Sequence, residues 1–250
     1  MIQEIDMNAI TENTIAAKTV TDVDEFYRGR FGEITSKIPA EISSLIERVL
    51  KEISFEEGVT SRNRRGGFDA FNCDVYGYDV KRNLAAIQLR HSWKRRESDW
   101  LNTSKWYALV GIDDGQIFSH VIDTSFRRNP NVDDATPEEI VRWAESKIFR
   151  VPVARLDTII RQGDVALVPV RSIPRSAKKI DGKDYKYTFR KSHKVRVDGW
   201  AYIDEESHRH WLDGTVEIDH IPGQHKPIGG EGRFEVVCGK RLDVDFSTVD

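Results

Sequence analysis

The chain has few cysteines and no long apolar run. Of its 250 residues only two are cysteine, Cys73 and Cys238, and no CxxC pair occurs. A zinc site built from cysteine pairs is therefore not expected, and one long-range disulfide is open but not implied. No run of about 18 apolar residues is present to cross a membrane, and the acidic first residues do not resemble a secretory signal. We therefore expect a cytoplasmic protein with reduced thiols and no membrane partner.

An excess of positive charge is also absent. The 38 Lys and Arg against 41 Asp and Glu give a formal net charge of −3. Nucleic-acid binding depends on neutralising phosphates with cations, so any such role must come from local patches. The six Trp, seven Tyr and eleven Phe supply enough bulky side chains for a folded core.

Two segments carry helical signals, and the segment between them reads as strands. From Ile38 to Ile53 apolar residues recur at steps of three and four, which predicts an amphipathic helix. The run Thr136-Pro137-Glu138-Glu139 predicts a second helix, because threonine caps, proline suits the first turn and Glu139 completes a capping box. Residues 68–122 alternate or run apolar as strands do, and Asp113-Asp114-Gly115 predicts a hairpin turn.

After Pro152 no helical signal returns, and short apolar stretches alternate with Gly, Asp and Pro. The predicted class is α+β: an antiparallel sheet with two amphipathic helices, followed by a β-rich C-terminal unit. We expect an N-terminal arm over residues 1–36, an α+β domain over 37–150 and a β-rich, histidine-containing domain over 155–245.

Four of the seven histidines lie in residues 208–225. His208 and His210 are two apart, a spacing that would point both rings to one face of a strand, and Glu217 follows nearby. This HxH and carboxylate resemble part of a cupin metal site, although the spacing is longer than the cupin pattern. The alternative is that the two histidines lie in an acidic surface loop and bind no metal.

A second likeness points to other histidines. RQGDVALVPV (161–170), SHKV (192–195) and HIPGQHKPIGGEGRFEVV (220–237) resemble uncharacterised bacterial and phage proteins. Those proteins have an RQGDVLL-like strand, a GHxHR-like segment and a closing H-x-x-H. The resemblance covers about residues 160–241 and brings no activity with it. It implies His193, His220 and His225 as a three-histidine set, with Lys191 standing where the family has another histidine.

Basic residues gather in three short segments, 62–65, 90–96 and 127–128, and the second of these contains Trp93. Arginine beside aromatic side chains suits phosphate contact and base stacking. The candidates for nucleic-acid binding are Arg62, Arg64, Arg65, Arg90, Trp93, Lys94, Arg95 and Arg96, with Arg127 and Arg128 as further cations. A metal-dependent nuclease is not indicated, since Gln88 and Arg90 stand where a carboxylate and a lysine would be needed.

Two functional hypotheses remain. The first is a metal-binding β domain, with a hydrolase or oxygenase not excluded, in which His193, His220 and His225 bind zinc or iron. In this case Glu217 or Asp219 would assist the ligands or act as a base. The second is a non-enzymatic module of a phage-related, mobile-element or defence assembly that binds nucleic acid or protein through the basic segments.

Overall fold

The computed structural model describes residues 38–55, 58–60, 68–94, 102–113, 116–122, 135–191, 193–220 and 226–243. The arm predicted for residues 1–36 lies outside this part of the chain. So do His225 and the basic residues Arg62, Arg64, Arg65, Arg95, Arg96, Arg127 and Arg128.

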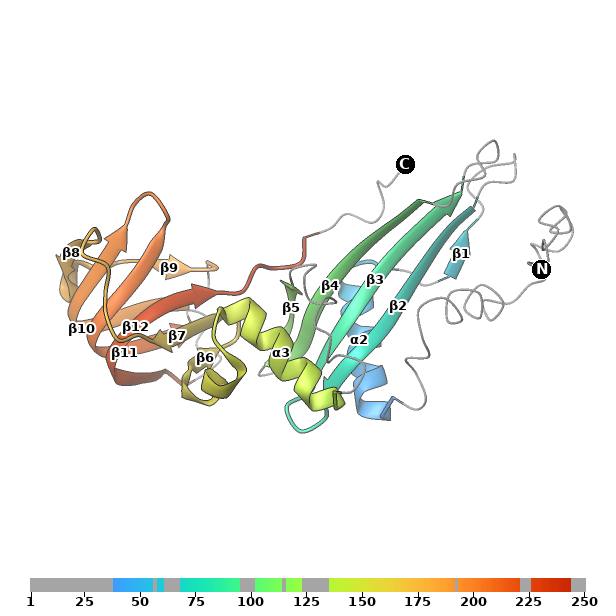
Figure 1. The fold of residues 1–250 in the computed structure, drawn as a ribbon, viewed down its shortest axis with the longest axis horizontal. Helices are drawn as coiled ribbons and strands as arrows, with labels where there is room; N and C mark the ends of the chain where they lie inside the picture. The colour runs from blue at the N-terminus through green and yellow to red at the C-terminus, as the bar shows by residue number, and fades with distance from the viewer. Residues whose placement is uncertain are drawn as a thin grey trace, which may run out of the picture.

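The described chain is mostly β and forms two antiparallel sheets (Figure 1). The first sheet has the order β1-β2-β3-β4-β5 and consists of β1 (Gly58–Thr60), β2 (Phe68–Asp79), β3 (Leu84–Lys94), β4 (Asn102–Asp113) and β5 (Gln116–Ile122). The second has the order β6-β7-β12-β11-β10-β8, with β9 also pairing with β10. Its strands are β6 (Ile160–Gln162), β7 (Val165–Pro169), β8 (Lys178–Asp181), β9 (Thr188–Phe189), β10 (His193–Asp204), β11 (Arg209–His220) and β12 (Ile228–Cys238). The helices are α2 (Ala40–Glu52) and α3 (Pro137–Phe149), with short 3₁₀ helices η3 (Val153–Thr158) and η4 (Gly182–Asp184). At this coarse level the α+β class is confirmed.

The first sheet is covered by a helix on each face. Ala85, Ile87 and Leu89 of β3 pack with α2, whereas Leu84 and Ala86 pack with α3. Because both faces are buried there, residues 84–89 of β3 form a nearly continuous apolar run rather than an alternating pattern. Figure 1 shows α3 between the two sheets.

The start of α3 has the capping box that the sequence predicts. The Glu139 N–H donates to Thr136 Oγ1 at 3.3 Å, and the Thr136 N–H donates to Glu139 Oε2 at 2.8 Å. Two backbone donors that the helix cannot use are thereby satisfied.

We expect Thr136→Ala to lower the free energy of unfolding by about 1 kcal/mol, because the cap is lost without disturbing the core. Urea denaturation of the two proteins measures this difference. An unchanged or higher unfolding midpoint in the variant would show that the capping box adds no stability.

A row of glycines crosses the second sheet. Gly199 pairs with Gly214, and Gly214 pairs with Gly232, so the three lie side by side on β10, β11 and β12. Their φ angles are 141°, 139° and 144°, a region that only glycine adopts without strain. Glycine kinks at one level allow three neighbouring strands to bend together.

The two sheets share a core and a stretch of backbone. Ala166 and Val168 of β7 pack in one cluster with Leu109 and α3. Beyond β12 the chain returns to the first sheet, where Lys240 accepts a hydrogen bond from Val121 and Leu242 donates one to Ser119. The end of the second sheet is thus tied to the edge strand of the first.

Candidate functional site

His193 and His220 lie directly opposite each other on neighbouring strands. They form the terminal register pair of β10 and β11, so both side chains project from one face of the sheet. Their ring centroids are 4.7 Å apart and the rings are inclined by 68°. His193 is buried, with 4% of its surface exposed. Two members of the predicted three-histidine set therefore meet, while His225 lies outside the described residues.

Asp164 lies beside this pair. Oδ1 of Asp164 is 3.4 Å from Nδ1 of His193, and its Oδ2 is 3.8 Å from Nε of Arg190. The main chain of Asp164 is fixed by a hydrogen bond that its carbonyl accepts from the Gly239 N–H. Arg190 in turn donates to the Gly239 carbonyl. Asp164 is thus held where it can orient the His193 ring.

Cys238, next to this group, is not a nucleophile. Burial raises the pKa of its thiol to about 11, with Arg190 acting in the opposite direction and Asp164 in the same one. The thiol is therefore protonated at neutral pH and a poor nucleophile. Cys73 and Cys238 are both free, so the disulfide left open by the sequence is not formed.

His120 is a buried imidazole at the junction of the two sheets. It is 1% exposed, stacks on Phe118 and pairs with Arg241 in an isolated bridge. Neither ring nitrogen has a hydrogen-bond partner within the described part of the chain. Burial lowers its pKa to about 3, and the positive charges of Arg161, Arg190 and Arg241 contribute to the shift.

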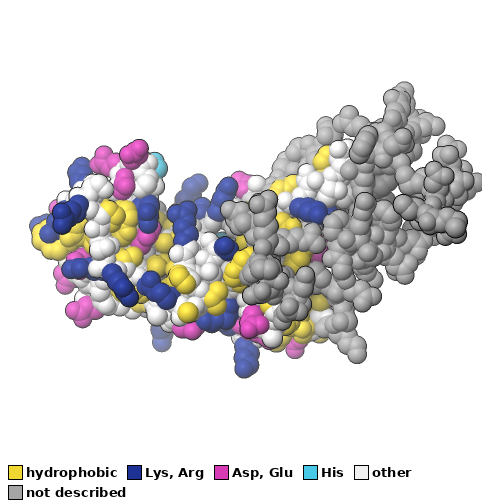
Figure 2. All heavy atoms as spheres, viewed as in Figure 1, with side chains coloured by type: hydrophobic (Ala, Val, Ile, Leu, Met, Phe, Trp, Pro, Cys, Tyr) yellow, Lys and Arg dark blue, Asp and Glu magenta, His cyan; other side chains and the backbone are white. Residues whose placement is uncertain are grey.

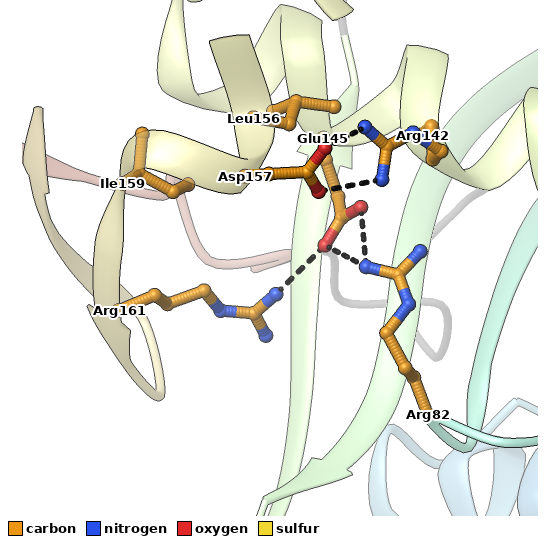
Figure 3. Close-up of a pocket in the computed structure, with 7 residues that line it drawn as sticks. All are labelled: Arg82, Arg142, Glu145, Leu156, Asp157, Ile159 and Arg161. Carbon is orange, nitrogen blue, oxygen red and sulfur yellow. Dashed lines mark hydrogen bonds and ion pairs between the residues drawn. The ribbon is translucent and has the colours of Figure 1, made fainter. Parts of the chain in front are cut away.

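Three arginines, one of them Arg161, line a small hollow (Figure 3). Its volume is about 170 Å³, and its walls are Arg82, Arg142, Glu145, Leu156, Asp157, Ile159 and Arg161. Glu145 accepts hydrogen bonds from Nη1 of Arg82 at 2.8 and 3.0 Å and from Nη1 of Arg161 at 3.1 Å. The guanidinium of Arg161 also lies over the rings of Phe118 and Phe149. Arg161 therefore lies over the same Phe118 ring that stacks on His120.

The alternative ligands His208, His210 and Glu217 do not come together. His208 lies in the turn between β10 and β11 with φ 53°, so the HxH does not project from one strand as the sequence suggested. His210 is buried in a ring of aromatics, where Tyr185 Oη is 3.1 Å from its Nδ1. Glu217 forms an exposed ion pair with Arg196, which also contacts Asp219. Across the residues that the structure describes, no group of three or more His, Cys, Asp or Glu is placed to hold a metal.

The basic candidates on β3 need one correction. Arg90 was expected to face phosphate, but it is 2% exposed and lies 3.4 Å from Asp74. Trp93 stacks on His91, which itself stacks on Phe71 and bonds to Asp69. The face shown in Figure 2 mixes Lys and Arg with Asp and Glu and shows no single basic patch among its described residues. For Lys94, at the end of β3, the prediction is untested.

The position corresponding to a nuclease carboxylate is occupied by a structural amide. Gln88 is 1% exposed and donates to the hydroxyl oxygens of Tyr76 and Tyr107 at 2.7 and 3.0 Å. The Gln88 side chain therefore has a structural role, in which it holds two tyrosines in the core beneath α3.

Asp164, Arg190, His120 and the arginine hollow were not predicted as functional features from the sequence. One signal was available, since the RQGD segment that carries the resemblance supplies both Arg161 and Asp164. The others come from distant segments, and only the fold brings them together.

Comparison of the chain with protein-family models, curated proteins and solved structures yields no match. No helix within the described ranges is long and apolar enough to span a membrane. We therefore base the proposed function on the geometry of the His193–His220 pair and its neighbours.

Proposed function

We propose that the protein binds a divalent transition metal, zinc or iron, through His193 and His220, with His225 as the third ligand. The observation that carries the proposal is the register pair His193–His220, with its two rings in contact beside Asp164. Neutral imidazole is the commonest nitrogen ligand for these metals. His225 enters on its sequence position alone.

Asp164 fits the role of the carboxylate that commonly supports a ligating histidine. With Nδ1 of His193 turned toward Asp164, Nε2 is the nitrogen that would bind the metal. A carboxylate in this place fixes the ring orientation and makes the ligating nitrogen more basic. Three protein ligands would leave a coordination position open, as in catalytic rather than structural zinc sites.

The nucleic-acid alternative gains no support from the described residues. Arg90 is enclosed and paired with Asp74, and Trp93 stacks on a buried histidine. The remaining basic candidates rest on sequence alone, so we do not advance that function.

We expect the full-length protein, loaded with Zn²⁺ and desalted, to retain about one equivalent per chain, as a site of this ligand number would. His193→Ala, His220→Ala and His225→Ala should each lose it, because two histidines alone hold zinc weakly. Asp164→Asn should keep the ligands but weaken zinc affinity about 10–100-fold. Elemental analysis gives the stoichiometry and competition with a chromophoric chelator gives the affinity.

His208→Asn is the matched control. His208 lies in a turn with positive φ, a conformation that asparagine also tolerates, and it is exposed. This variant should retain zinc, and circular dichroism should show that every variant is folded. If folded His193→Ala and His220→Ala bind zinc as tightly as the wild type, the proposal is wrong.

A further inference from the structure

The arginine hollow is built from three separate parts of the chain. Arg82 follows β2, Arg142 belongs to α3 and Arg161 to β6, and their guanidinium groups converge on one space (Figure 3). At about 170 Å³ the hollow is smaller than the roughly 300–1,000 Å³ of sites for drug-sized ligands. It therefore suits a small charged group.

The two carboxylates that line the hollow differ in accessibility. The Glu145 side chain is 7% exposed and bridges Arg82 and Arg161. The Asp157 side chain is 77% exposed and binds Arg142 in a bidentate pair, with N–O distances of 2.9 and 3.0 Å. Exposed ion pairs contribute little net free energy, so Asp157 can be replaced at low cost whereas Glu145 cannot.

Charge balance indicates what could replace Asp157. The three guanidinium groups face three carboxylates, because Asp79 binds Nε of Arg82 from outside the hollow. If Asp157 turns away, one positive charge is left uncompensated, and Arg142 regains a bidentate donor face. The hydrogen bonds that Arg142 donates to Asp157 are the main reason that the pKa of Arg142 is raised, and the charge of Arg82 acts against it. The two guanidinium groups therefore repel each other, as they do around an anion site.

We propose that this hollow binds a phosphate group, which displaces Asp157 and is held by Arg142 together with Arg82. Planar guanidinium groups bind phosphate oxygens in bidentate pairs, and donors from several directions suit a tetrahedral group better than a planar carboxylate. Leu156 and Ile159 give the hollow an apolar wall that would meet the organic part of a phosphomonoester. This site is separate from the histidine pair and does not depend on metal binding.

Asp157→Asn is the informative variant, since it removes the competing carboxylate. We expect it to tighten binding of inorganic phosphate about three- to tenfold, and Arg142→Gln to weaken it at least about tenfold, the range for gain or loss of one charge-assisted pair. Isothermal titration of the full-length protein with inorganic phosphate, at an ionic strength held constant with chloride, gives the affinities. A parallel titration with ribose 5-phosphate distinguishes free phosphate from a phosphomonoester, which should bind more tightly if the apolar wall is used.

Asp213→Asn is the control, because Asp213 forms a partly exposed ion pair with Arg233 on the second sheet, away from the hollow. It should leave phosphate affinity unchanged. A hollow that serves only as an ion-pair network gives a different result: no phosphate binding above the chloride baseline, or equal affinities for wild type, Asp157→Asn and Arg142→Gln. Either outcome overturns the proposal. Zinc binding is unaffected in every case, so this test and that of the metal site fail independently.

Discussion

Gly214→Ala is expected to lower the free energy of unfolding by about 4 kcal/mol or more, a large part of the roughly 5–15 kcal/mol that stabilises a typical protein. A Cβ atom at this position would stand 2.1 Å from the carbonyl oxygen of Asp198, which belongs to the paired strand. The φ angle of 139° adds strain of about 1–3 kcal/mol for any residue with a side chain. Since the clash is with backbone, no rotamer change relieves it.

Two other glycines of the same sheet separate these contributions. At Gly232 the φ angle is 144° but the nearest atoms to an added Cβ are 3.7 Å away, so Gly232→Ala should cost only the conformational strain, about 1–3 kcal/mol. At Gly230 the only close contact of an added Cβ, at 2.7 Å, is with the end of the flexible Ile160 side chain, and Phe234 lies at an ordinary 3.6 Å, so Gly230→Ala should cost about 1 kcal/mol or less. Urea denaturation of the three variants should rank them Gly214, Gly232, Gly230. Equal losses of unfolding free energy for Gly214→Ala and Gly230→Ala would contradict the proposed steric requirement for glycine at position 214.

Acid should destabilise the junction through His120. Its pKa is about 3 in the folded protein against 6.5 for an exposed imidazole, so the unfolded chain takes up a proton that the folded chain does not. The stability that this group contributes is therefore complete above pH 6.5 and is lost as the pH falls toward 3. Each pH unit in this window removes about 1.4 kcal/mol.

His120→Leu should remove this dependence, because leucine fills much of the same space and does not titrate. The difference in unfolding free energy between variant and wild type should change by about 2–3 kcal/mol in favour of the variant between pH 6.5 and 4.5. Denaturation curves at several pH values measure it, with His208→Asn as a control that follows the wild type. Comparing the two proteins cancels other groups, including His210, whose pKa is also lowered by burial. Stability curves that stay parallel over this range would show that His120 titrates normally.

Much of the fold follows from local patterns. The capping box at Thr136 and the pairing of Asp113 with Gln116 at the β4–β5 hairpin depend on neighbours in sequence, which is why they could be predicted. The burial of Arg90 could not, because it depends on the pairing of β3 with β2, which brings Asp74 to 3.4 Å from the guanidinium. The return of residues 239–242 to β5 likewise joins segments about 120 residues apart, a pairing with no local signal.

The candidate site was predicted only in part. The meeting of His193 and His220 depends on the register of β10 and β11, and the resemblance of short motifs pointed to both residues. The prediction that His208 and His210 lie on one face of a strand was wrong, because His208 has a positive φ angle and lies in the turn before β11. Asp164 lies in the turn before β7 and Arg190 follows β9, so their approach to His193 depends on the fold.

The most direct test of the proposed metal centre is a crystal structure of the full-length protein grown with Zn²⁺, with data collected at the zinc absorption edge. The account predicts one strong anomalous peak within about 2.1 Å of a ring nitrogen of both His193 and His220. The peak should disappear in crystals of His220→Ala. An anomalous map with no peak between these two rings, in crystals that contain bound zinc elsewhere or none at all, would contradict it.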